Sequence, residues 1–305
     1  MIMRRKSRSI RVGNIKIGGD APIAIQSMTN TETASVSATV SQIKRLEKCG
    51  CEIVRVAVKS FDDASAIKTI KKKIRIPIVA DIHFDHRLAL KSIAGGADKI
   101  RLNPGNIRNR DEILQVVKAA KKAQIPIRIG VNSGSIIRSP QSTVHSPQSK
   151  AFSSKLLVKS ALNYIKLFER MDFRDIIISL KSSDVVSTVD SYRKIAKLCE
   201  YPLHLGVTAT GPYESGVVKS SVGIGALLLD GIGDTIRVSL TADPVEEVVA
   251  AKRILAACGV RRFGPDIISC PTCGRCQVDL IKLVKELDSK LQAPNSKLQA
   301  KKPEA

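Results

Sequence analysis

The chain has 305 residues, of which 43% are hydrophobic and 26% charged, and its formal net charge is +22. This composition is typical of a globular protein and excludes an extended disordered chain. The sequence contains no run of about 18 apolar residues, so it predicts no membrane span. Its basic start is not followed by an apolar segment, so it predicts no signal peptide. We therefore expect a cytoplasmic protein.

Eight apolar runs alternate with amphipathic helical patterns from about residue 21 onward. Apolar runs are typical of parallel strands buried on both faces, and eight strand-helix units predict an α/β protein with a closed, TIM-like (β/α)8 barrel. An open, doubly wound sheet is the alternative, but it would usually carry a Gly-rich turn after its first strand. The expected strands are 23–26, 53–58, 76–80, 99–102, 125–131, 176–180, 203–207 and 235–240, and the expected helices include 37–49, 61–72, 110–123, 153–171, 187–200, 217–229 and 244–257.

Two segments depart from this alternation. Residues 134–152 are rich in Ser, Pro and Gln, which predicts a mobile loop above the barrel or a disordered insertion. The sequence Ser-Lys-Leu-Gln-Ala occurs at 289–293 and again at 296–300, and no core can be built from it. We expect a substrate-binding barrel over residues 1–258 and a partial second domain with a low-complexity tail over residues 259–305.

Polar residues recur where the expected strands end. Barrel enzymes build their sites at the carboxyl ends of the strands, and residues two apart on a strand point to the same side. Pairs such as Asp81 and His83 are therefore expected to face the same mouth. His83 is either a general acid there or a rim residue without a chemical role. The candidate binding residues are Arg55, Asp81, His83, Arg101, Asn103, Arg128, Asn132, Lys181, Thr208, Arg237 and Ser239.

Five of these candidates are cations on successive strand ends. Guanidinium groups bind phosphate oxygens in a bidentate fashion, so the cluster predicts a small substrate with several negative charges. The alternative is that each Arg pairs with a neighbouring carboxylate such as Asp81. The cations are Arg55, Arg101, Arg128, Lys181 and Arg237.

The net charge also suggests nucleic-acid binding, because clustered Lys and Arg release counterions from phosphate backbones. The basic residues are, however, spread over most of the expected helices, as on solvated outer faces. Only six Phe and four Tyr, and no Trp, are available for stacking on bases. We therefore expect no specific nucleic-acid partner, and a basic nucleic-acid-binding protein remains an alternative reading.

Seven cysteines are an odd number in a chain too large to need disulfides, which favours reduced thiols and a metal site. The sequence Cys270-Pro-Thr-Cys273-Gly-Arg-Cys276 contains a C-x2-C turn, which aims two thiolates at one metal. Structural zinc and cubane clusters both take four ligands. Cys276 is a possible third thiolate, and a zinc site would need a fourth ligand.

The motifs together resemble those of the 4-hydroxy-3-methylbut-2-enyl diphosphate synthase family. The resemblance covers residues 10 to about 290, in order. It rests on the segments 25–31 (IQSMTNT), 80–85 (ADIHFD), 101–107 (RLNPGNI), 126–132 (PIRIGVN), 231–240 (GIGDTIRVSL) and 270–273 (CPTC).

The resemblance implies a barrel that binds 2-C-methyl-D-erythritol 2,4-cyclodiphosphate and a small domain that carries a 4Fe-4S cluster, with Cys270 and Cys273 as two ligands. It implies two-electron reductive ring opening with loss of water, electrons from flavodoxin or ferredoxin, and a homodimer. Arg55, Arg101, Asn103, Arg128, Lys181, Arg237 and Ser239 match the substrate contacts of the family.

Two departures from the family pattern predict impaired activity. The remaining cluster ligands of the family, in a Gly-Cys-Val-Val-Asn-Gly-Pro-Gly-Glu segment, are expected beyond residue 305, so the chain is expected to be truncated. The Thr-Glu-Ala-Gly of the family is Thr208-Ala209-Thr210-Gly211 here, so Ala209 replaces an active-site Glu. The alternative function is a barrel that binds cyclodiphosphate without turnover.

Overall fold

The computed structural model describes residues 2–103, 107, 109–132 and 147–292, with the side chains of 147–153 and 292 excluded. The chain divides into two compact units, Met1–Val260 and Arg261–Ala305. Three segments named in the sequence analysis lie partly outside the described residues: positions 104–106 of the motif 101–107, most of the loop at 134–152, and the tail from residue 293 onward.

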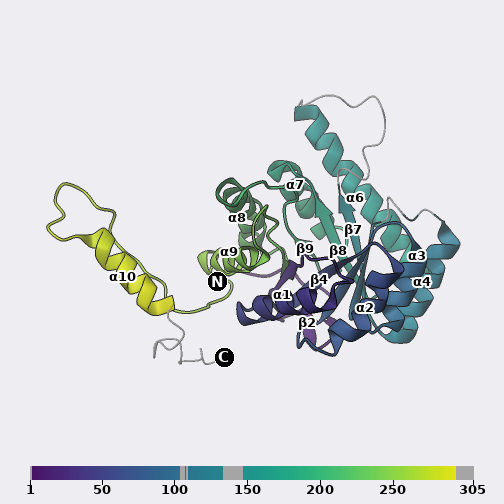
Figure 1. Ribbon diagram of the computed structural model, residues 1–305. Helices are drawn as coiled ribbons and strands as arrows, with labels where there is room; N and C mark the ends of the chain where they lie inside the picture. Colours follow the sequence, from purple (N-terminus) through teal and green to yellow (C-terminus); the bar gives the residue numbers. More distant parts are fainter. Residues whose placement is uncertain (1, 104–106, 108, 133–146, 293–305) are drawn as a thin grey trace. The chain divides into compact units, whose positions relative to one another are not determined.

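The first unit is built on eight parallel strands, which confirms the predicted barrel (Figure 1). The sheet order is β8-β7-β6-β5-β4-β3-β10-β9. A parallel bridge between Ile178 and Leu203 joins the first and last strands of this order and closes the barrel. The strands are β3 (Ala24–Met28), β4 (Ile53–Val58), β5 (Ile78–Ile82), β6 (Lys99–Leu102), β7 (Ile127–Asn132), β8 (Ile176–Lys181), β9 (His204–Leu205) and β10 (Thr235–Ile236).

Several strand boundaries differ from the expected ones, most clearly those of β5, β9 and β10. Strand β5 begins at Ile78, two residues later than expected, because Pro77 has no backbone N–H with which to enter the ladder. Asp81 therefore lies within the strand instead of after it. Strands β9 and β10 have two residues each, although Arg237 N still donates a hydrogen bond to Leu205 O at 3.0 Å.

Helices surround the barrel (Figure 1). The first turns of α6 replace part of the expected loop at 134–152, so that expectation was wrong for residues 147–152. The helices are α1 (Val36–Lys48), α2 (Phe61–Lys71), α3 (His86–Ala94), α4 (Arg110–Ala123), α6 (Pro147–Arg170), α7 (Val185–Ala196), α8 (Tyr213–Leu229) and α9 (Pro244–Ala257).

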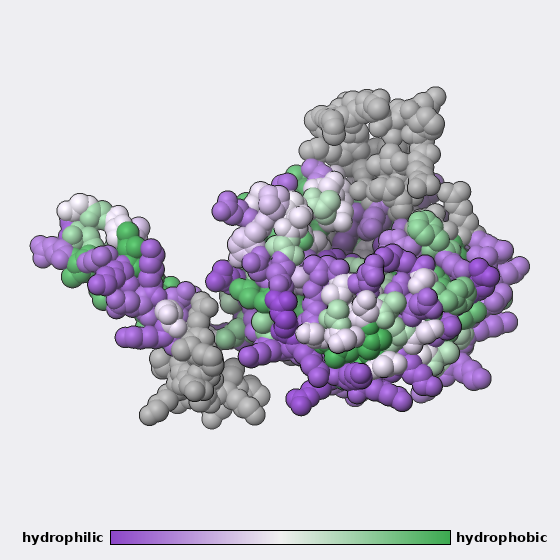
Figure 2. Space-filling view, in the orientation of Figure 1, coloured by the Kyte–Doolittle hydropathy of each residue, from purple (hydrophilic) through white to green (hydrophobic). Residues whose placement is uncertain are grey.

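The outer faces of these helices and the turns that follow them carry many of the basic residues. Lys72, Lys118 and Lys121 are exposed, and hydrophilic residues cover much of the face seen in Figure 2. The expected solvation of the helix-borne lysines is thus confirmed. A large part of the net charge lies outside the barrel interior.

Short polar side chains cap the helices that follow the strands. Ser60 and Asp63 form a reciprocal capping box at the start of α2, and Asp85, Asp184 and Asp243 each accept a hydrogen bond from a backbone N–H in the first turn of their helix. Such caps satisfy backbone donors that have no partner within the helix. They fix where each strand-to-helix connection ends, and thereby the rim of the barrel.

A β-hairpin, which the sequence analysis missed, packs against the amino-terminal end of the barrel. Its strands are β1 (Ile10–Val12) and β2 (Ile15–Ile17), which pair in antiparallel register. Ile10, Val12 and Ile17 are buried in one cluster with apolar residues from the beginnings of the barrel strands. The barrel residues of this cluster are Ala24, Ile53, Val79 and Ile177.

The second unit contains helix α10 (Leu280–Gln292) after a segment without regular structure. Ile281, Leu283 and Leu287 on this helix are exposed. Among the described residues of the chain, no helix combines the length and apolar character that crossing a membrane requires.

Candidate active site

A cavity of about 210 Å³ lies at the carboxyl ends of the barrel strands. Met28 and Ser179, which were not predicted, also line it. Asn103 is buried directly after β6 but is not one of the lining residues. The other ten predicted binding residues line the cavity together: Arg55, Asp81, His83, Arg101, Arg128, Asn132, Lys181, Thr208, Arg237 and Ser239.

The pleat of the strands explains why these residues converge. Asp81, Arg101 and Arg128 are successive register partners on β5, β6 and β7, so their side chains point to the same inner face. Asn132 is register partner to Lys181 on β8. Polar residues two positions apart on a strand can be recognised in the sequence, and this pattern accounts for most of the residues that line the cavity.

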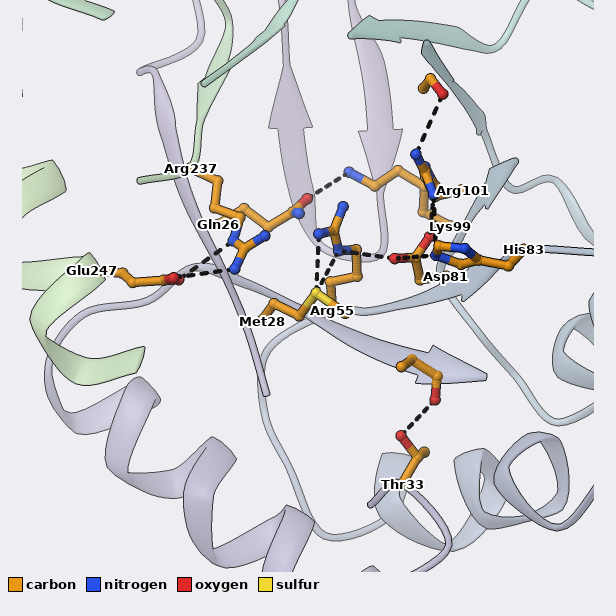
Figure 3. A network of polar contacts seen from close by, with 12 residues as sticks. Gln26, Met28, Thr33, Arg55, Asp81, His83, Lys99, Arg101, Arg237 and Glu247 are labelled. Atoms are coloured by element: carbon orange, nitrogen blue, oxygen red, sulfur yellow. Dashed lines mark hydrogen bonds and ion pairs between the residues drawn. The ribbon is translucent and has the colours of Figure 1, made fainter. Parts of the chain in front are cut away.

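Asp81 is the carboxylate at the centre of the cation cluster (Figure 3). Its Oδ1 accepts a hydrogen bond from Arg101 Nη1 at 3.0 Å, and its Oδ2 lies 3.5 Å from Arg55 Nε and 3.6 Å from His83 Nε2. Burial alone would raise the pKa of Asp81, but the charges of Arg55 and Arg101 outweigh it and hold this pKa well below its usual range. Asp81 also supplies the orienting partner that the sequence did not reveal for His83.

Glu247 is a second buried carboxylate at the site, and the sequence analysis missed it. Its Oε1 accepts a hydrogen bond from Arg237 Nη2 at 3.1 Å (Figure 3). Its Oε2 accepts one from Ser27 Oγ at 3.0 Å. The residue lies on the buried face of α9 with Pro244, Val248 and Ala251. A charged residue at helical spacing among apolar ones was the signal that could have revealed it.

Three cations of the barrel interior have no carboxylate within 4.0 Å among the described residues. They are Arg128, Lys181 and Lys99, and the last was not predicted although it lies two residues before Arg101 on the same strand. Arg128 is 1% exposed, and its Nε and Nη1 have no hydrogen-bond partner in the described part of the chain. Pairing with carboxylates thus accounts for Arg55, Arg101 and Arg237 but not for Arg128 or Lys181.

Burial and mutual repulsion shift the pKa values of these cations. Burial lowers the pKa of Arg55 to about 10, where Asp81 opposes the shift and Arg237 adds to it. Burial also lowers the pKa values of Arg128 and Lys181 well below their usual ranges, and neighbouring guanidinium groups lower them further. An anion in the cavity would offset this repulsion.

Two glycines provide the space that the cations occupy. A Cβ atom added to Gly130 would lie 2.6 Å from Arg101 Nε, and one added to Gly206 would lie 2.6 Å from Lys181 Nζ. Both separations are too short for any side chain to be present without displacing the cation. The two glycines therefore let long basic side chains lie across the inside of the barrel.

The position that carries a Glu in the family pattern lies at the rim of the cavity. Thr208 lines the cavity, and Ala209 directly after it is exposed with a left-handed φ of 52°. Glu214 is exposed in the first turn of α8 and is not one of the lining residues. Neither residue therefore places a carboxylate on the cavity.

His204 is a core histidine and does not line the cavity. It is fully buried, and its Nδ1 lies 2.7 Å from Thr235 Oγ1. Burial lowers its pKa well below the usual range, with Arg128 and Lys181 adding to the effect.

The thiols of the second unit lie on one turn. Cys270, Cys273 and Cys276 are exposed, and Cys276 N donates a hydrogen bond to Cys273 O at 2.9 Å. Hydrogen bonds from Arg275 lower the pKa of Cys273. Thiolates are the donors that iron-sulfur clusters take, but in the described residues no three His, Cys, Asp or Glu side chains gather closely enough to hold a metal. The donor type fits a cluster, and the described residues do not supply a complete ligand set.

Comparison with known proteins identifies relatives over nearly the whole chain. Residues 7–252 match the family model described as the GcpE TIM-barrel domain. The chain is 54% identical over 295 residues to a 4-hydroxy-3-methylbut-2-en-1-yl diphosphate synthase (flavodoxin) of Fusobacterium nucleatum, with 97% of this chain and 82% of the relative covered. It is 53% identical over 290 residues to the protein of that name in Clostridium perfringens, with 95% and 82% covered.

Solved structures show the same fold at low sequence identity. A dihydropteroate synthase from Stenotrophomonas maltophilia superposes with a TM-score of 0.60 at 16% identity, covering 84% of this chain and all of the other. The dihydropteroate synthase of Coxiella burnetii gives 0.59 at 13% identity, with the same shares covered. At these identities the likeness concerns the barrel fold alone.

Proposed function

Because the chain belongs to the GcpE family of 4-hydroxy-3-methylbut-2-en-1-yl diphosphate synthases, we propose that it acts in isoprenoid biosynthesis. The proposed substrate is 2-C-methyl-D-erythritol 2,4-cyclodiphosphate and the product is 4-hydroxy-3-methylbut-2-enyl diphosphate. The reaction adds two electrons and opens the ring by breaking a C–O bond to phosphate. The hydroxyl on the neighbouring carbon takes up a proton and leaves as water, and a C=C double bond forms between the two carbons. The printed name of the relatives points to flavodoxin as the electron donor, with ferredoxin as the alternative.

The observation that carries this proposal is the uncompensated positive charge of the cavity. Arg128 and Lys181 face the cavity without a carboxylate within 4.0 Å among the described residues, and two Arg side chains share Asp81. Buried cations without partners destabilise a fold, so their presence favours a ligand with at least two negative charges. A cyclic diphosphate has this charge and fits guanidinium forks.

The lining residues divide into two roles in this proposal. Arg55, Arg101 and Arg237 are held in place by carboxylates and bind phosphate oxygens in fixed directions, and Arg128 and Lys181 neutralise the remaining charge. His83 is half exposed beside Asp81, where it is placed to hold or donate a proton at the leaving oxygen. Asn103, Asn132, Thr208 and Ser239 are the proposed hydrogen-bond partners of the substrate.

The proposed cofactor is a 4Fe-4S cluster with Cys270 and Cys273 as two of its ligands. Such a cluster, when bound, passes electrons singly from the donor protein to the substrate. The family resemblance further suggests a cytoplasmic homodimer in which the cluster domain of one subunit closes over the barrel of the other. The exposure of all three thiols supports their availability as ligands.

Ligand binding and turnover test this proposal separately. Calorimetric titration with cyclodiphosphate should show binding that Arg128→Met weakens. Anaerobic iron-sulfur reconstitution should give the visible absorbance of a cluster, which Cys270→Ser and Cys273→Ser abolish and Cys258→Ser, at the end of α9, leaves intact. The effect of Cys276→Ser decides whether this thiol is a third ligand. Absence of cyclodiphosphate binding would refute the proposal.

Binding without turnover is the second candidate function, and the exposed Ala209 favours it. If a carboxylate at this rim position is required for proton transfer, the wild-type chain binds cyclodiphosphate but does not convert it with reduced flavodoxin. Ala209→Glu should then restore turnover in the reconstituted protein without changing the affinity greatly. Turnover by the wild type would eliminate this candidate.

A further inference from the structure

Lys99 is a fully buried lysine that hydrogen-bonds to a neutral group. Its Nζ donates to Gln26 Oε1 at 3.2 Å (Figure 3), and no carboxylate of the described residues lies within 4.0 Å of it. A charged ammonium in this place would lose its hydration without an ion pair in return. Burial accordingly lowers the pKa of Lys99 well below its usual range, and Arg128 and Arg55 lower it further, while Asp98 opposes them.

Lys99 does not line the cavity, but it lies close to Arg101, which does. It precedes Arg101 by two residues on β6, so both side chains enter the barrel interior from the same face of the strand. Arg101 is in turn register partner to Arg128. Lys99 contacts Gln26 of β3 and interacts electrostatically with charged or titratable groups from four other places: Arg55 of β4, Asp98 before β6, Arg128 of β7 and His204 of β9.

We propose that Lys99 takes up a proton when a phosphate-bearing anion enters the cavity, so that the barrel binds its substrate and a proton together. The proton comes from solvent and converts the Nζ amine to an ammonium. Negative charge beside Arg55 and Arg128 offsets the two cations that repel a charge on Lys99, and the group becomes easier to protonate. This inference rests on the proposed function and adds to it a coupling between substrate and proton.

The coupling predicts how anion affinity depends on pH. Because the complex holds more protons than the free barrel, affinity falls as pH rises, by up to about tenfold per pH unit for each proton taken up. Gln26 Oε1 is already in place to accept a hydrogen bond from the ammonium that forms. No backbone movement is needed for the change of charge.

Calorimetry in buffers of different ionisation enthalpy measures the coupling directly, since the heat of binding then varies with the number of protons exchanged. The full chain is titrated at neutral pH with cyclodiphosphate. As a second probe it is titrated with trimetaphosphate, a cyclic anion that does not titrate in this range. The wild type should take up protons with both anions, and Lys99→Met and Lys99→Gln should each reduce the uptake by about one proton. Lys73→Met, which removes an exposed lysine after α2, should leave the uptake unchanged.

The outcomes separate this inference from the proposed function. Equal uptake in the wild type and both Lys99 variants, no uptake in the wild type, or no binding of either anion would overturn the inference. If cyclodiphosphate binds but the proton uptake does not depend on Lys99, the inference is overturned and the proposed function stands. Lys99-dependent uptake with trimetaphosphate, but no binding of cyclodiphosphate, would support the inference and refute the proposed substrate. Thermal unfolding verifies that the variants fold, as expected when a buried amine is replaced by uncharged groups.

Discussion

Arg128 has the greatest volume among the fully buried side chains of the described residues, and two of its nitrogens have no partner there. At the residue scale, this is the clearest sign that the barrel interior serves a ligand at the expense of stability. Asp81 and Glu247 compensate three other guanidinium groups, so their positions are fixed before any ligand arrives. Preorganised and uncompensated cations thus lie side by side in one cavity.

Arg128→Met is expected to change the stability of the fold and the affinity for the substrate in opposite directions. The substitution removes a buried, unpaired charge and keeps most of the volume, so the thermal unfolding temperature should rise. The affinity for cyclodiphosphate should fall roughly 10- to 150-fold, as expected for losing a charged hydrogen bond worth about 1.5–3 kcal/mol. Arg253→Met, on the exposed face of α9, is the matched control and should change neither quantity. A loss of stability in Arg128→Met would show that the guanidinium is compensated after all.

Asp81→Asn should have the opposite effect on stability. It leaves Arg55 and Arg101 buried without their carboxylate, and breaking such a pair destabilises a protein by about 3–5 kcal/mol. The pKa of Asp81 is lower in the folded barrel than in the unfolded chain. The carboxylate therefore stabilises the fold above the unfolded pKa of about 3.9, and this contribution is lost as pH falls through the folded pKa.

Urea denaturation at neutral and acidic pH checks this expectation for Asp81. The difference in unfolding free energy between wild type and Asp81→Asn should be largest near neutral pH and should shrink as pH falls below about 4. A difference that is independent of pH would mean that packing, and not the charge of Asp81, stabilises the barrel.

At the scale of elements, the residues that stabilise the barrel and the residues that line the cavity lie at opposite ends of the barrel. The hairpin β1–β2 and the first residues of the strands form an apolar cluster at the amino-terminal end. The polar residues occupy the carboxyl end, where capped helix starts define the rim. This division is general for such barrels, because the loops at the carboxyl end can vary without disturbing the layers beneath.

Ile17→Ala tests this separation. Ile17 is fully buried in the hairpin cluster, so the truncation should lower the free energy of unfolding by about 2–5 kcal/mol. Lys16→Ala, on the exposed side of the same strand, should have little effect. Calorimetry should show unchanged affinity for cyclodiphosphate in both variants. Reduced affinity in folded Ile17→Ala would mean that the hairpin also positions the cavity.

At the scale of the whole molecule, whose net charge is +22, one set of cations is exposed on the outer helices and another set is buried in the barrel interior. The exposed lysines create a diffuse positive field, which attracts any polyanion without selecting a sequence. The buried cations act only on a ligand that enters the cavity. The two sets of charges are therefore expected to respond differently to salt.

Duplex DNA binding distinguishes the two sets. The protein should bind DNA without sequence preference, and this binding should weaken by orders of magnitude between about 50 and 200 mM salt. Cyclodiphosphate binding in the desolvated cavity should weaken much less over the same range. Filter binding at several salt concentrations measures the first quantity and calorimetry the second. Sequence-specific DNA binding that persists at about 200 mM salt would instead favour a nucleic-acid-binding protein.

The amino-acid sequence by itself determined the barrel and most of the cavity. Eight apolar runs with helical patterns between them indicate parallel strands, and the spacing of two residues places pairs such as Asp81 and His83 on the same side of a strand end. The family motifs assigned a substrate class to these cations. Such patterns are local, so they can be read without knowing which strands are neighbours.

Only the tertiary structure decided which charges compensate one another. Glu247 reaches Arg237 from α9, and Lys99 meets Gln26 across the barrel, 73 positions apart in sequence. These contacts depend on closing the sheet, which brings distant strands within hydrogen-bonding distance. The hairpin at the amino-terminal end was missed because its three-residue strands are too short for a periodic pattern. Charge balance inside a barrel is a property of the closed structure, whereas the positions of its charged residues are a property of the strands.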